Sequence, residues 1–411
     1  MQNKSLSIIN PLCLCLFSIT FIYDYCKHIN IPLVVGSFAI WFITSQIIEP
    51  NWTTRASKMI RYIVPLYIVD LIYCIAVEDS IAQTFITSTL AYLWILIFFF
   101  YIRNVNLLKW SILFFIAVLC VDCFDTVAGN LAVPGASRMQ GDGYDRLEAA
   151  LLMQSMHIGG YPLLYALTFL TLPVALWIKY KLPMRILSIV FLVISIATIF
   201  VGSYFLSILF SLLLISSSFV NAKKSKRLFF IILSMLTIFV VFKDPILNGV
   251  IYIGENIESP ILIGHATELK EGEKTTTTTT GRGDLYMGAV QNFLDSPLIG
   301  QIGDVKLAHE SGHSELLEYL EKYGLFAIPF FLFWYNLIKS VRREIQSESI
   351  RVYYYLYSVC LFVFMLINPI RWGQPLVFVL FFGAPLLFIV IDQKSLASHK
   401  NHKQSQYIDM L

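Results

Sequence analysis

Long runs of apolar residues alternate with short polar segments along most of the chain. A helix needs about 17 to 25 mostly apolar residues to cross the hydrocarbon core of a bilayer. The pattern therefore predicts an all-α polytopic membrane protein with about 12 transmembrane helices. The expected spans are residues 6–23, 31–48, 60–77, 83–101, 110–127, 160–178, 186–202, 204–220, 228–242, 325–338, 352–368 and 375–391.

The composition agrees with a membrane protein. Of the 411 residues, 57% are hydrophobic and 14% are charged, whereas soluble domains carry about 25% charged residues. The seven cysteines fall mainly inside apolar runs and lack metal-ligand spacing with histidine, so we expect them to be packing residues. Basic residues flank the membrane segments and form no separate patch, so we expect no nucleic-acid partner.

Basic residues gather in alternate short loops, which predicts the orientation. Because Lys and Arg near helix ends are retained in the cytoplasm, both termini are expected inside. The first segment lacks a small-residue cleavage site and is interpreted as a retained span. The expected cytoplasmic set is Lys4, Arg55, Lys58, Arg61, Arg103, Lys109, Lys179, Lys181, Arg185, Lys223, Lys224, Lys226, Arg227, Lys339, Arg342, Arg343, Arg351, Lys394, Lys400 and Lys403.

This topology divides the chain into four regions. Residues 1–242 hold helices one to nine, with a first external loop at 128–159. Residues 243–324 form a large external loop between helices nine and ten. Residues 325–391 hold the last three spans, and residues 392–411 form a cytoplasmic tail.

The large loop ends in a polar stretch, residues 281–324, that carries the candidate chemistry. Apolar positions between residues 285 and 294 predict a helix on the membrane surface, with Arg282 at its N-terminal edge. A second amphipathic helix is predicted over residues 314–323, ended by Gly324. Its expected apolar face is Leu316, Leu317, Leu320 and Tyr323, and its expected polar face is Glu315, Glu318, Glu321 and Lys322.

His313 stands just before this second helix, where the helix dipole favours a neutral imidazole that can act as a base. The external arginines are few, and the large loop, which is acidic overall, contains only Arg282. A guanidinium binds phosphate oxygens bidentately and stays charged. We therefore expect His313 and Arg282 to be catalytic, as general base and anion clamp. The substrate-binding candidates are Arg138, Arg146, Arg371 and His309.

Three alternatives to this interpretation remain open. Arg282 and His313 could simply cap helices on a solvated loop. His309 to His313 also spell H-E-x-x-H, the zinc-protease pattern, which requires a continuous helix. Ser311 and Gly312 disfavour that helix and a third ligand is hard to find, so we expect neither metal nor cofactor. Asp70 is an intramembrane carboxylate, which is either functional or positioned at the membrane interface.

The order Gly281-Arg282, Pro297-Leu298-Ile299-Gly300, His313 and Gly324 resembles the external loop of bacterial O-antigen polymerases and ligases. The resemblance covers about 60 residues. It departs at Ser314, where family members commonly have Asn, and at Ser203-Tyr204, where many have Ser-Arg. The spacing from Pro297 to His313 is similar to that of the polymerases.

The resemblance implies a metal-independent glycosyltransferase with a GT-C-like fold in the bacterial inner membrane, acting at the periplasmic face. It implies undecaprenyl-pyrophosphate-linked oligosaccharides as substrates, with Arg282 binding pyrophosphate and His313 as base. The expected function is a polymerase of O-antigen or capsular repeat units, with a chain-length regulator and a flippase as possible partners. The alternatives are an O-antigen ligase acting on lipid A-core and a polysaccharide flippase.

Overall fold

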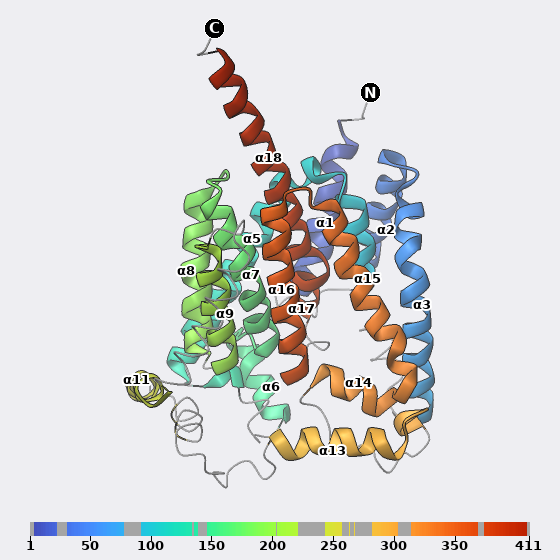
Figure 1. Cartoon of the computed structure of the whole chain (residues 1–411), viewed down its shortest axis with the longest axis vertical. Helices are drawn as coiled ribbons and strands as arrows, with labels where there is room; N and C mark the ends of the chain where they lie inside the picture. The colour runs from blue at the N-terminus through green and yellow to red at the C-terminus, as the bar shows by residue number, and fades with distance from the viewer. Residues whose placement is uncertain are drawn as a thin grey trace.

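The computed structural model describes residues 4–22, 31–77, 92–133, 135–138, 146–202, 204–220, 243–256, 263, 267, 282–302, 314–368 and 374–408. Within these residues the regular structure is entirely helical. The upright helices of Figure 1 are α1 (Leu6–Ile22), α2 (Ile31–Ile48), α3 (Trp52–Val77), α5 (Lys109–Ala132), α7 (Tyr161–Lys179), α8 (Arg185–Val201), α9 (Phe205–Ser218), α15 (Ile328–Glu344), α16 (Glu348–Ile367), α17 (Gln374–Phe378) and α18 (Ala384–Ile408). Shorter elements are α6 (Arg146–Ser155), α11 (Lys243–Asn256), α13 (Arg282–Asp295) and α14 (Glu315–Tyr323).

Six helical segments in the described part of the chain are long and apolar enough to cross a membrane. They are Trp52–Ala76, Trp110–Ala132, Tyr161–Lys179, Glu315–Glu344, Glu348–Ile367 and Gln374–Leu396. The shorter apolar helices are Leu6–Ile19, Pro32–Ile48, Tyr92–Tyr101, Arg185–Val201 and Leu206–Ser218. The protein is thus a helical membrane protein, as the sequence predicts.

Two helices extend beyond the bounds expected from the sequence, and one expected span cannot be compared. The predicted ninth span, residues 228–242, lies outside the described residues. Helix α5 continues to Ala132, past the point where we expected the first external loop to begin. Helix α18 continues to Ile408, so the described part of the expected tail is helical.

Aromatic side chains pack the interior of the bundle. The Trp94 indole is fully buried, and its ring lies 4.9 Å from that of Phe378 and 5.2 Å from that of Phe17. The contact with Phe378 is edge-to-face, a geometry that adds to the dispersion energy of burial. Helix α7 and the segment Gln374–Leu396 are central, because most of their residues are buried.

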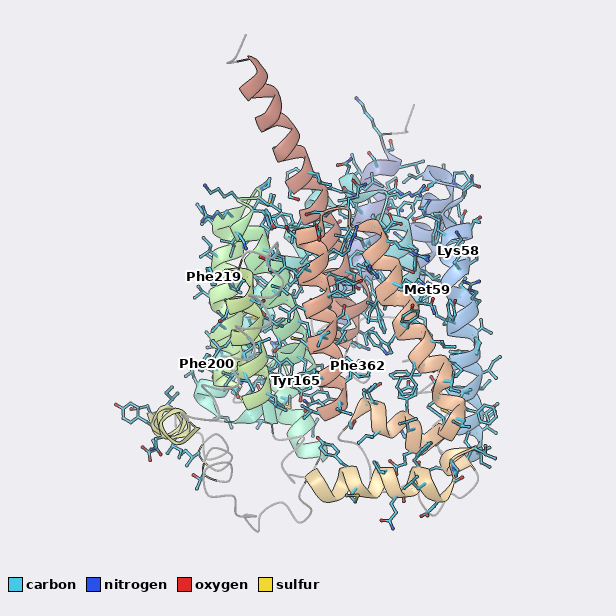
Figure 2. All side chains as sticks on the ribbon, in the orientation of Figure 1. Lys58, Met59, Tyr165, Phe200, Phe219 and Phe362 are labelled. Atoms are coloured by element: carbon cyan, nitrogen blue, oxygen red, sulfur yellow. The ribbon has the colours of Figure 1, made fainter. Side chains whose placement is uncertain are left out.

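The outer surface of the bundle is apolar. Ile186 is 79% exposed, and Ile68 and Val359 also project outward. Soluble proteins rarely expose contiguous apolar surface of this extent, so these side chains face lipid. Both termini lie at one end of the bundle, and α13 and α14 lie at the opposite end (Figure 1). Figure 2 shows Tyr165 in the half near α13, and Lys58 in the half near the termini.

Candidate functional site

Helices α13 and α14 lie across the end of the bundle opposite the termini (Figure 1). Helix α14 contacts α13 on one side and both α3 and α16 on the other. It begins at an N-cap, Ser314, whose hydroxyl accepts a hydrogen bond from the Leu317 amide at 3.2 Å. The amphipathic segments predicted from the sequence are therefore two helices stacked over the membrane bundle.

The Pro297-Leu298-Ile299-Gly300 turn packs directly on the C-terminal end of α14. The Leu325 amide donates to the Pro297 carbonyl at 2.8 Å, and the Gly300 amide donates to the Ser296 carbonyl at 2.9 Å. Gly300 and Gly324 have φ angles of 57° and 55°. This left-handed backbone favours glycine, so the two glycines allow the turn and the helix end to approach.

Glu321 joins α13, the turn and α14. Its Oε1 accepts from the Asn292 amide at 2.6 Å and from the Gln301 amide at 2.8 Å. The Gln301 Oε1 in turn accepts from the Tyr73 hydroxyl of α3 at 3.1 Å. This chain of hydrogen bonds ties the external helices to a membrane-spanning helix.

Asp70 and Tyr323 form a second link to α3. The Tyr323 hydroxyl donates to Asp70 Oδ1 at 2.6 Å, and the Asp70 side chain is buried. The Asp70 carboxylate therefore lies inside the protein against α14, seven residues before the end of α3, and the two roles considered for it both stay open. It anchors the helix that follows His313 in the sequence.

The predicted polar face of α14 is not solvated. Glu315 is 2% exposed, Glu318 is 8% exposed and Glu321 is fully buried. These glutamates are buried because α14 is covered on two sides, by α13 and by the bundle. Glu318 is paired with Lys322 at 2.6 Å, and the glutamates become part of the interior at this end.

The last turn of α16 receives three contacts from the external helices. The Tyr286 hydroxyl of α13 donates to the Ile367 carbonyl at 2.8 Å. The Glu315 amide donates to the Asn368 carbonyl at 3.3 Å, and the Ser314 hydroxyl lies 3.5 Å from the Met365 carbonyl. Both external helices are thus fixed to the same helix end.

Asn368 is the polar centre of this junction. Its Oδ1 accepts from the Tyr165 hydroxyl of α7 at 3.2 Å, while its buried Nδ2 has no hydrogen-bond partner among the described residues. The Tyr161 hydroxyl lies within electrostatic range of Glu315 and Glu318. A buried amide donor beside carboxylates and phenols is an arrangement that can bind hydroxyl groups.

The first external loop is held against α5 and the start of α7. Asn130 and Ser137 exchange two hydrogen bonds, from Asn130 Nδ2 to Ser137 Oγ at 2.6 Å and from the Ser137 amide to Asn130 Oδ1 at 3.1 Å. The Gly159 amide donates to Thr126 Oγ1 at 2.8 Å. The short helix Ala136–Arg138 is therefore fixed close to the N-terminal end of α7.

The structure describes the backbone at three of the six predicted site residues. Arg138 closes the short helix Ala136–Arg138, Arg146 begins α6 and Arg282 begins α13. The side chains of these arginines, and all of His309, His313 and Arg371, lie outside what the structure describes. Their predicted roles stay predictions.

Sequence reasoning missed Glu315, Glu318, Glu321 and Asn368 as interior residues of this junction. The sequence held no signal for the burial of the glutamates, because their spacing places them opposite the apolar face of α14, which is typical of a solvated face. Among the residues described, no group of three His, Cys, Asp or Glu side chains is positioned to hold a metal ion.

No protein-family model matches the chain, and no curated protein matches it significantly.

Proposed function

We propose that the protein is a polymerase that joins undecaprenyl-pyrophosphate-linked oligosaccharide repeat units into O-antigen or capsular polysaccharide. In this proposal the chain has about 12 spans in a GT-C-like arrangement and works at the periplasmic face of the bacterial inner membrane. Arg282 binds the pyrophosphate and His313 is the general base. Arg138, Arg146, Arg371 and His309 contribute to substrate binding.

The convergence on the last turn of α16 is the observation that supports this proposal most. Tyr286, which contacts Ile367, lies one helical turn after Arg282, a rise of about 6 Å along the axis. Ser314 follows His313, so their Cα atoms are about 3.8 Å apart. Asn368 precedes Arg371 by three residues, which limits their Cα separation to about 11 Å. Residues that are close in sequence to Arg282, His313 and Arg371 therefore lie together at the last turn of α16.

The proposed reaction follows from the chemistry of these side chains. The acceptor hydroxyl oxygen forms a bond to the anomeric carbon of the donor sugar, and its proton passes to the His313 imidazole. The bond between the anomeric carbon and the pyrophosphate oxygen breaks, and the electron pair leaves with the pyrophosphate on its carrier. Arginine guanidinium groups stabilise the charge of that leaving group without a metal.

The carboxylates of α14 suit the sugar part of the substrate. Buried carboxylates such as Glu315 and Glu318 repel anions, but they accept hydrogen bonds from sugar hydroxyls. Asn368 supplies a donor, and Tyr161 and Tyr165 supply aromatic surface beside it. Tyr204, at the position where many members of the resembled family carry Arg, packs edge-on against Tyr165 at 5.7 Å. In this proposal that position contributes to saccharide contact instead of phosphate binding.

Deleting the gene and analysing the surface glycan by gel electrophoresis tests the proposal. A polymerase deletion leaves glycan that is one repeat unit long. A ligase deletion leaves lipid A-core without glycan, and a flippase deletion leaves the glycan inside the cell. The purified protein with lipid-linked repeat units alone must also produce a ladder of products, and a single unextended band from active preparations contradicts the proposal.

A further inference from the structure

Four basic side chains line one cavity at the end of the bundle that carries the termini. Lys339, Arg342 and Arg343 come from the last turns of α15, and Arg351 comes from the first turn of α16. The cavity has a volume of about 310 Å³. All of its lining residues are cations, so an anion is the complementary occupant.

The backbone around this cavity is held in place by hydrogen bonds. Asp392 of α18 accepts from the amides of Gln346 and Ser347, both at 2.8 Å. Arg351 Nη2 donates to the Ile345 carbonyl at 2.9 Å. These contacts fix the turn between α15 and α16, so the backbone that carries the four cations is in place before a ligand binds.

Two of the cations lie over tyrosine rings at the outer surface. The Arg342 guanidinium is 4.8 Å from the ring centre of Tyr355, and Lys339 Nζ is 5.2 Å from that of Tyr335. The tyrosines are 38% and 59% exposed. Exposed tyrosines beside Lys and Arg are typical of the headgroup region of a membrane.

The charge of the cavity is not balanced within the described protein. Glu344 and Glu348 belong to the adjoining helix ends, but neither lines the cavity. Among the described residues, none of the four cations forms an ion pair with a carboxylate. Four like charges around one space repel one another, and a bound anion would reduce this repulsion.

We propose that this cavity binds the phosphodiester headgroup of an anionic phospholipid from the leaflet nearest the termini. We assign the bound anion to a lipid because α15 and α16 also expose apolar side chains about two helical turns deeper in the membrane, where the acyl chains would lie. Leu332 of α15 is 45% exposed and Val359 of α16 is 60% exposed. Guanidinium groups suit the phosphate, since they bind its oxygens bidentately. This site is independent of the proposed polymerase reaction.

Thermal unfolding of the full-length protein in a nonionic detergent tests the inference. The probes are phosphatidylglycerol, phosphatidylcholine and inorganic phosphate. Phosphatidylglycerol is expected to raise the unfolding midpoint, whereas phosphatidylcholine and inorganic phosphate are not. In Arg342→Gln/Arg343→Gln, the affinity for phosphatidylglycerol measured by native mass spectrometry should fall roughly 30-fold.

The matched control is Lys181→Gln/Arg185→Gln, which removes two exposed cations at the same end of the bundle, outside the cavity. It should bind phosphatidylglycerol like the wild type. The variant Arg342→Lys/Arg343→Lys keeps both charges but loses the bidentate guanidinium groups, so its affinity for phosphatidylglycerol should lie between those of the wild type and the glutamine variant. Wild-type affinity in the glutamine variant, a lysine variant that binds no better than the glutamine variant, or an equal response to phosphatidylcholine or inorganic phosphate would each overturn the inference.

Discussion

Gly300 and Gly324 lie against each other: a β-carbon added to Gly324 would be 2.8 Å from the Gly300 amide nitrogen and 2.5 Å from the Pro297 carbonyl oxygen. The reverse contact is as close, because a β-carbon on Gly300 would be 2.5 Å from the Glu321 carbonyl oxygen. Backbone atoms occupy the space on both sides. The Pro-x-x-Gly turn and the glycine that ends α14 are thus two halves of one joint, although they are far apart in the sequence.

Gly324→Ala should destabilise the protein strongly. Its positive φ alone costs of order 1–3 kcal/mol for a residue with a β-carbon, and the clash with Pro297 adds to that. Gly288→Ala on α13 is the control, because nothing lies within 4 Å of its β-carbon. That change should stabilise the helix by about 0.5–1 kcal/mol. Denaturant titration of both variants checks this, and equal stability of the two would show that the joint does not form.

Breaking the contact between Asp70 and Tyr323 should destabilise α14 on the bundle. Tyr323→Phe removes the donor to a buried carboxylate, which costs about 1–3 kcal/mol. Tyr335→Phe, at a side chain that is 59% exposed, should change stability by less than about 0.5 kcal/mol. A double-mutant cycle with Asp70→Asn should give a coupling energy above about 0.5 kcal/mol, and strict additivity would argue against the contact.

Arg282→Ala and His313→Ala should each abolish chain extension while the protein still inserts and folds. A missing general base alone lowers the rate by roughly 10² to 10⁴. Met287→Ala, at an exposed position one turn further along α13, is the control and should retain activity. Product ladders from reconstituted protein measure the effect, and near-wild-type extension by Arg282→Ala would remove that residue from the site.

Chelation separates the arginine and histidine mechanism from the zinc alternative. Treating the purified protein with EDTA should leave the rate of chain extension unchanged, because arginines stabilise the leaving group. His309→Ala should reduce activity less than His313→Ala does. If EDTA stops the reaction and zinc restores it, the result supports the H-E-x-x-H alternative and contradicts the proposed mechanism.

The end of the bundle near the termini should lose stability in acid. Hydrogen bonding from the Arg55 guanidinium lowers the pKa of Glu49 from its usual 4.5. Burial acts in the opposite direction, and a hydrogen bond from Asn104 lowers the pKa further. A lowered pKa means that the ionised Glu49 stabilises the fold above pH 4.5, and that this contribution is lost as the pH falls through the folded-state value. Glu49→Gln should flatten the pH dependence of the unfolding midpoint in this range. An unchanged slope in Glu49→Gln would assign the acid sensitivity to other groups.

The α14 helix shows where reading a sequence succeeds and where it stops. Its N-cap at Ser314 and its end at Gly324 follow from local chemistry, namely a hydroxyl that caps an amide and a residue that accepts a positive φ. The burial of its glutamates does not. It depends on other elements: Asn292 of α13 and Gln301 of the short helix Gly300–Ile302 donate to Glu321, and Tyr73 of α3 donates in turn to Gln301.

The sequence by itself determined that this is a helical membrane protein, and where most of its helices lie, because the length and apolarity of each span are local properties. It also marked the polar stretch at residues 281–324 as the region of interest. Only the tertiary structure decided that α13 and α14 fasten to the last turn of α16, that Asp70 faces Tyr323, and that four cations surround one cavity. Those relationships arise from packing between segments far apart in the chain, and no local pattern encodes the partner of a buried polar group.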